Sequence, residues 1–337
     1  MQKAMTVHGP VAADELGHIL PHEHILMEFP DLGQKPKYPE LWDEKISLKI
    51  LGRLRRDIWS CKDNLRLNEP DVMQQEVASF KQHGGGTIVD VTPIGLKRQA
   101  PAVAEIARQT GVHILVGTGY YIQAGHPNQV ATLSVDDITR WMVREVTVGI
   151  DETSIRAGII GEIGISSMTP DEAKVLRAAA RAQRETGAPL SVHQFGGNEL
   201  LQIDAILREE DVSPTSVILC HMSSVTAEQC LWAAERGYYI EFDCFGNEYY
   251  TDPLAGIITR DPDRIRMIKE LIARGHLRQI LISNDIALKM LLKKYGGWSY
   301  EHLIVNIKPL MLREGLPPKA IDTMMYYNPM RVIAYLD

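Results

Sequence analysis

The stretch His18-Ile19-Leu20-Pro21-His22-Glu23-His24-Ile25-Leu26 lies near the start of this 337-residue chain. Its apolar flanks, Ile19-Leu20 and Ile25-Leu26, indicate a buried strand. On a strand, His22 and His24 point to the same face and Glu23 points away from it. Two converging neutral imidazoles are a common way to hold a transition metal. Taken alone, the pair is equally compatible with one structural and one exposed histidine.

Composition narrows the class of protein. The length fits two ordinary domains or one large α/β barrel, and 45% hydrophobic with 23% charged residues is typical of a soluble globular chain. A net charge of −7 without a Lys/Arg cluster argues against a nucleic-acid partner. No apolar run is long enough for a bilayer, the first residues lack a signal-peptide core, and the 4 cysteines lack CxxC spacing. We therefore expect a cytoplasmic protein without a membrane partner.

Short apolar runs alternate with helical segments along the chain. Two helix starts are marked by caps, at Ser134 with Asp137 and at Thr169-Pro170-Asp171-Glu172. This alternation predicts a parallel sheet, and eight runs predict a (β/α)8 TIM barrel. A doubly wound sheet would carry a glycine-rich turn after its first strand, which this sequence lacks. We expect one domain over residues 1–337, with strands at 18–24, 87–91, 113–117, 158–163, 190–193, 217–221, 239–243 and 279–285.

Polar side chains end five of these runs, where the active sites of barrels form. Each alone has an ordinary explanation, because buried histidines often bond a backbone carbonyl and an Asp after a strand often caps a helix. Together they ring one cavity, and buried carboxylates are costly without cations. Two divalent metal ions would satisfy the set, with three groups on one ion, two on the other and one shared carboxylate. The residues are His22, His24, Glu162, His193, His221 and Asp285.

The pattern HxH…E…H…H…D resembles the amidohydrolase superfamily of metal-dependent barrels. Several motifs are similar to the phosphotriesterase family in particular, and Gly161-Glu162-Ile163-Gly164 resembles its phosphotriesterase-related branch. The resemblance covers nearly the whole chain and implies a binuclear metal-dependent hydrolase that acts as a homodimer. It implies Zn²⁺, with Mn²⁺ or Co²⁺ as alternatives. The other motifs are Gly17-His18-Ile19-Leu20-Pro21-His22-Glu23-His24, Thr87-Ile88-Val89-Asp90-Val91-Thr92, Tyr295-Gly296-Gly297 and Asn328-Pro329.

The resemblance also implies a role for each ligand. His22 and His24 match the histidine pair of the more buried metal, which Asp285 also binds. His193 and His221 match the pair on the more exposed metal.

Three positions bear on where this chain lies within the family pattern. Glu162 matches the bridging ligand, where many members carry a carboxylated lysine. Cys244 follows Asp243 where relatives that open acyl-homoserine lactones carry an arginine, which argues against that specificity. Tyr121 matches a tyrosine over the exposed metal of lactonase relatives and is a catalytic candidate, although a rim aromatic that packs a loop is equally compatible.

The expected reaction is attack by a metal-bridging hydroxide on a small-molecule ester, lactone or amide, with phosphotriester hydrolysis as a side activity. Asp285 is the expected proton acceptor. Loops at 29–42, 246–262 and 287–300 are expected to shape the pocket, with Trp42, Tyr249 and Trp298 as lining candidates. Two alternatives stay open: a TatD-like metal-dependent deoxyribonuclease, and an inactive barrel used for binding.

Overall fold

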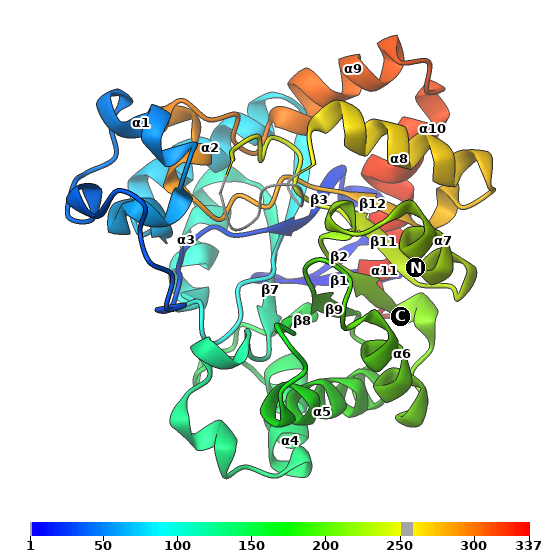
Figure 1. The fold of residues 1–337 in the computed structure, drawn as a ribbon. Coiled ribbons are helices and arrows are strands. Elements are labelled where there is room, and N and C mark those ends of the chain that lie inside the picture. The colour runs from blue at the N-terminus through cyan, green and yellow to red at the C-terminus, as the bar shows by residue number, and fades with distance from the viewer. Residues whose placement is uncertain (1, 251–258) are drawn as a thin grey trace.

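Eight parallel strands form the central sheet of the protein (Figure 1). The computed structural model describes residues 2–250 and 259–337, so part of the expected loop at 246–262 lies outside it. Sheet neighbours follow one another along the chain, in the order β12-β11-β10-β9-β8-β7-β6-β3. The strands are β3 (His18–Glu23), β6 (Gly85–Asp90), β7 (His113–Thr118), β8 (Ile159–Gly164), β9 (Leu190–His193), β10 (Val217–Leu219), β11 (Tyr239–Phe242) and β12 (Ile280–Ile282).

The junction between the last strand, β12, and the first, β3, closes the barrel. The His22 N–H donates to Ser283 Oγ at 3.2 Å, and the Asp285 N–H donates to the His22 carbonyl at 3.3 Å. Glu23 points away from the histidine face, as alternation predicts, and accepts from Ser283 Oγ at 2.7 Å and from the Asn284 N–H at 2.8 Å. The predicted (β/α)8 barrel is confirmed.

Side chains alternate between two cores. Val89, Leu115, Ile159, Ile218 and Leu281 fill the barrel interior with a second layer of apolar residues from the N-terminal segment. Their strand neighbours point outward and pack under the helices, as a period of two requires. These outward residues include Ile88, Ile114, Ile160, Val217 and Ile280.

Helices cover the outside of the barrel, and capping boxes start three of them. Both predicted caps are present and both are capping boxes, at Ser134 with Asp137 and at Thr169 with Glu172, and Gly187 ends the second helix in the left-handed conformation. A third box at Thr226 was not predicted. The helices are α1 (Leu48–Leu54), α2 (Pro70–Gln82), α3 (Ala100–Thr110), α4 (Val135–Thr147), α5 (Pro170–Thr186), α6 (Leu200–Glu209), α7 (Ala227–Glu235), α8 (Asp261–Ala273), α9 (Lys308–Arg313), α10 (Pro318–Asp322) and α11 (Asn328–Ile333).

The two ends of the described chain meet beneath the barrel (Figure 1). An antiparallel hairpin of β1 (Lys3–Thr6) and β2 (Gly9–Ala12) precedes β3. Lys3 exchanges two backbone hydrogen bonds with Leu336, at 2.7 and 3.0 Å. Asn328 Nδ2, at the start of α11, donates to the Leu277 and Ile280 carbonyls at 2.8 Å, which anchors the last helix under β12.

The segment after β3 packs against the loop after β12. It contains the short antiparallel pair β4 (Met27–Glu28) and β5 (Arg66–Leu67) as well as α1. The buried ammonium of Lys289 joins the two parts by donating to Asp63 at 3.0 Å and to Glu69 at 2.7 Å. Within residues 2–250 and 259–337, no helix combines the length and apolar character that crossing a membrane requires.

Candidate metal centre

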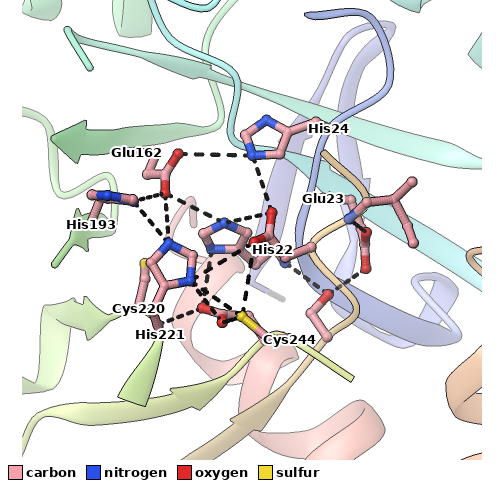
Figure 2. Close-up of polar contacts among 12 residues, drawn as sticks. His22, Glu23, His24, Glu162, His193, Cys220, His221 and Cys244 are labelled. Atoms are coloured by element: carbon pink, nitrogen blue, oxygen red, sulfur yellow. Dashed lines mark hydrogen bonds and ion pairs between the residues drawn. The ribbon is translucent and has the colours of Figure 1, made fainter. Parts of the chain in front are cut away.

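All six predicted ligands lie together at the carboxyl ends of the strands. Figure 2 labels the four histidines and Glu162. Five strands position them, and they converge because the strand ends of a barrel surround one axis. His22 lies within β3 and His24 directly follows it, while Glu162 lies in β8. The remaining three are the last residue of β9, the second residue after β10 and the third after β12, namely His193, His221 and Asp285.

Glu162 lies at the middle of the cluster. Its Oε1 is 2.6 Å from His193 Nδ1, 3.0 Å from His221 Nε2 and 3.6 Å from His22 Nε2. Its other oxygen, Oε2, faces His24 Nε2 at 3.8 Å. The carboxylate therefore faces both histidine pairs at once, which is the arrangement a shared ligand needs (Figure 2).

Asp285 completes the cluster from the opposite side of the β12–β3 junction. Its Oδ1 lies 3.4 Å from His24 Nε2 and 3.8 Å from His22 Nε2, and its Oδ2 lies 4.0 Å from His221 Nδ1. Its side chain is 16% exposed, whereas the His22 side chain is fully buried. Asp285 can therefore contact a bound small molecule as well as the His22–His24 pair.

Outer partners orient three of the imidazoles. His22 Nδ1 bonds Glu241 Oε2 at 3.1 Å, and His221 Nδ1 bonds Asp243 Oδ1 at 2.9 Å. His24 Nδ1 bonds the hydroxyl of Thr92, whose own proton goes to Asp90. With the Nδ1 proton used in this way, the lone pair of each Nε2 is directed into the cluster.

The donor set fits divalent cations. His22 Nε2 is buried and has no hydrogen-bond partner in the described structure, and an orphaned buried nitrogen of this kind is expensive unless it binds something. Four imidazoles and two carboxylates are nitrogen and oxygen ligands suited to Zn²⁺, Mn²⁺ or Co²⁺. The cluster is therefore able to bind metal.

The electrostatics of the cluster also favour positive charge. Burial opposes the charged form of Glu162, but the surrounding His193, His221 and His22 outweigh burial and hold its pKa well below its ordinary value. Burial likewise opposes protonation of His221, yet the adjacent Asp243 raises the pKa of this imidazole well above its ordinary value. Glu162 is therefore anionic, and Asp243 favours positive charge at His221.

The backbone at two of the predicted ligands is strained. His221 and Asp285 have φ angles of 56° and 51°, in the left-handed region that residues with a Cβ rarely adopt. Such conformations persist where the surrounding structure over-determines them, and they gather at functional sites. Here the left-handed turn directs each ligand toward the cluster immediately after its strand ends.

A cavity of about 450 Å³ opens beside the cluster. His193, His221 and Asp285 line it, together with Tyr121 and Tyr249. The Tyr121 ring lies edge-on to the His193 ring, with centroids 5.0 Å apart, so this predicted residue does reach the site.

The other two predicted aromatics lie elsewhere. Trp42 lines a neighbouring hollow of about 630 Å³ formed by the 29–42 segment, and Trp298 lines a third hollow near Arg55. Of the three aromatic candidates, Tyr249 is the one that lines the cavity of the cluster among the described residues. The expectation for Trp42 and Trp298 is wrong. Both loops do line the cavity, but through other residues, namely Phe29, Leu32, Gln34, Ala287, Leu288 and Leu291.

Sequence reasoning missed Glu241. It lies in β11 with a fully buried side chain and bonds the fully buried His22. Alternation along Tyr239-Ile240-Glu241-Phe242-Asp243 places Glu241 and Asp243 on one face, so a signal for inward-pointing acids was present.

Comparison with known proteins shows the family of this chain. The model of the phosphotriesterase family matches residues 2–333. The chain belongs to the phosphotriesterase family. This confirms the resemblance, and with it a metal-dependent hydrolase of a family that is binuclear-metal dependent.

Three similar proteins span nearly the same length. N-acetyltaurine hydrolase of Rattus norvegicus is 36% identical over 99% of this chain and 98% of its own. The phosphotriesterase-related protein of Nematostella vectensis is 38% identical, covering 97% of both chains. The crystal structure of a resiniferatoxin-binding protein from Rhodobacter sphaeroides has a TM-score of 0.94 at 37% identity and covers 98% of this chain and 95% of its own. Membership in this family disfavours the TatD-like alternative.

Proposed function

We propose that this phosphotriesterase-family hydrolase cleaves the amide bond of an N-acylated small amine, with N-acetyltaurine as the first candidate substrate. The observation that carries the proposal is the contact of Glu162 with both histidine pairs beside an open cavity. Relatives named N-acetyltaurine hydrolase match over nearly their whole length, which supports an amide among the ester, lactone and amide substrates expected from the sequence.

We propose two divalent metal ions as cofactors, most simply Zn²⁺. His22, His24 and Asp285 would hold one ion, His193 and His221 the other, and Glu162 would bind both. When bound, such a pair supplies a Lewis acid for the acyl oxygen and a hydroxide nucleophile near neutral pH.

The chain's own groups would handle the proton and the oxyanion. Asp285 lines the cavity, so it would accept the proton of the attacking water and pass it to the leaving nitrogen. The hydroxyl of Tyr121 would donate to the acyl oxygen as negative charge develops there. One water is consumed: its oxygen bonds the acyl carbon, the C–N bond breaks, and the products are a carboxylic acid and an amine.

The direct test is a substrate comparison with Zn²⁺-loaded protein. N-acetyltaurine, a γ-lactone, a phosphotriester and single-stranded DNA are each supplied, and product release is measured. We expect the highest kcat/KM for N-acetyltaurine and a slow side activity on the phosphotriester. A lactone or DNA cleaved faster than every N-acyl amine would contradict the proposal, and no turnover of any substrate would favour a binding protein.

We further propose that the protein acts as a homodimer in the cytoplasm. Light scattering of the purified protein tests the assembly, and a mass of one chain would contradict it.

A further inference from the structure

One cationic side chain faces the cavity of the metal centre. Arg264, in the first turn of α8, is 1% exposed and lines the same cavity of about 450 Å³ as His193, His221 and Asp285. Among the described residues that line this cavity, it is the only lysine or arginine. The proposed reaction centre and one guanidinium therefore share a chamber.

The guanidinium retains hydrogen-bonding capacity. Arg264 Nη1 donates to Asp261 Oδ1 at 2.8 Å, and Nε makes a long contact of 3.4 Å with Ser223 Oγ. A guanidinium has five N–H donors, and within residues 2–250 and 259–337 Nη2 has no hydrogen-bond acceptor. At least two donors are therefore left for another partner.

The charge of Arg264 is also incompletely balanced. Its one carboxylate partner among the described residues, Asp261, accepts in addition from the Gly246 N–H at 3.0 Å and from His302 Nε2 at 2.9 Å. Asp261 is thus shared among three donors. An ion pair that served only to anchor the start of α8 would not require the arginine to line the reaction cavity.

The rest of the cavity lining favours binding of an anion next to Arg264. Apolar side chains, among them Ile122, Phe195 and Leu288, form much of the lining. Surroundings of low polarity strengthen the attraction between a guanidinium and an anion. Arginine also matches the planar fork of carboxylate and the oxygens of sulfonate with two parallel hydrogen bonds.

We propose that Arg264 is a specificity-determining residue that binds an oxyanion, carboxylate or sulfonate, on the amine half of the substrate while the acyl group lies at the metal centre. This inference rests on the proposed amide hydrolysis and narrows it to N-acyl amino acids and N-acyl aminosulfonates.

The first test compares a charged substrate with its uncharged isostere. N-acetyltaurine and N-(2-methylsulfonylethyl)acetamide differ in that a neutral methyl sulfone replaces the sulfonate. Arg264→Gln should lower kcat/KM for N-acetyltaurine roughly 100-fold, mainly through KM, and change that of the sulfone less than about threefold. Arg264→Lys keeps the charge and the Asp261 pair, so it should fold even where the Gln variant does not and lose about tenfold on N-acetyltaurine alone.

An exposed arginine provides the matched control. Arg236 directly follows α7 and does not line the cavity, so Arg236→Gln should leave the kcat/KM of both substrates unchanged. Equal losses on the charged and the neutral substrate in the Arg264 variants would overturn the proposal and leave a structural ion pair.

A second readout needs no turnover. Sodium ethanesulfonate should raise the thermal unfolding midpoint of the Zn²⁺-loaded wild type but not that of Arg264→Gln. Protection that depends on Arg264 without any amide hydrolysis would refute the proposed function and support the anion site. Hydrolysis of N-acetyltaurine at equal rates with and without Arg264 would refute the anion site and support the proposed function.

Discussion

The imidazole of His22 bonds Glu241 through Nδ1, at 3.1 Å, inside the barrel where neither side chain is exposed. Glu241 is adjacent to a second buried acid, Asp243, and burial raises the pKa of Glu241. A charged Glu241 carboxylate is therefore destabilising in the metal-free protein. Binding of a cation by His22 would offset this cost, because the Glu241 hydrogen bond raises the basicity of the imidazole.

Glu241→Gln should therefore weaken binding of Zn²⁺ by about 10- to 100-fold without lowering the free energy of unfolding of the metal-free protein. Competition with a chromogenic chelator and urea unfolding measure the two quantities. The control is Glu172→Gln, because Glu172 is equally buried but caps α5 away from the cluster. A large loss of stability with unchanged affinity would contradict a role in orienting His22.

Asp285→Asn should lower kcat by a factor of about 10² to 10⁴, because the amide cannot accept the proton of the attacking water. Much of the metal should stay bound, since His22, His24 and the shared Glu162 are unchanged. Turnover and metal content measured on the same sample separate the two effects. Activity near that of the wild type would exclude Asp285 as the base.

Tyr121→Phe should lower kcat about 100-fold with little change in KM, the loss typical of one oxyanion donor. Burial raises the pKa of Tyr121 well above its ordinary value, so the hydroxyl keeps its proton at any pH used for assay. The variant should therefore lower kcat by the same factor at pH 7 and pH 9. Unchanged kcat would show that the ring only packs against His193.

Lys289→Met should destabilise the metal-free protein by roughly 2 to 4 kcal/mol at pH 7, because it leaves buried Asp63 without one of its cations. Burial opposes ionisation of Asp63, but Lys45, the Ile46 N–H and Lys289 outweigh burial and lower its pKa. Because the pKa of Asp63 is lower in the folded state than its unfolded value of about 3.9, ionised Asp63 stabilises the fold at pH values above about 3.9. This contribution is lost as the pH falls through the folded pKa.

The difference in unfolding free energy between wild type and Lys289→Met should therefore shrink as the pH falls from 5 toward 3.5. Urea unfolding at three pH values measures it. Lys294 is the matched control, because it pairs with Glu69, as Lys289 does, but is exposed. Lys294→Met should lower the free energy of unfolding by less than about 1 kcal/mol. A difference that grows on acidification would refute this account of Asp63.

The fold could be predicted because its signals are local. Each strand is a short apolar run, and Ser134 and Thr169 start their helices with side chains three residues from their partners. The order of strands followed from the alternation of strand and helix. That one domain spans residues 1–337 stays a prediction.

The site could be predicted as a set of ligands but not as a packed structure. His22, Glu162 and Asp285 lie at or near the carboxyl ends of their strands, and a barrel brings these ends together wherever the intervening helices pack. The contact of Glu241 with His22 depends on the direction of two side chains that are more than 200 residues apart in the sequence. The position of Arg264 at the cavity depends on where α8 begins. No local pattern specifies those contacts.

Glu23 accepts hydrogen bonds from Ser283, Asn284 and Ile286, the residues that flank Asp285, while its own neighbours are His22 and His24. A metal ion bound by His22, His24 and Asp285 would consequently cross-link positions near the two ends of the chain. In thermodynamic terms, such an ion would bind the folded chain and not the unfolded one, so it would stabilise the whole barrel by mass action. Chelation should then lower the thermal unfolding midpoint of the whole barrel, far beyond the residues that touch the metal.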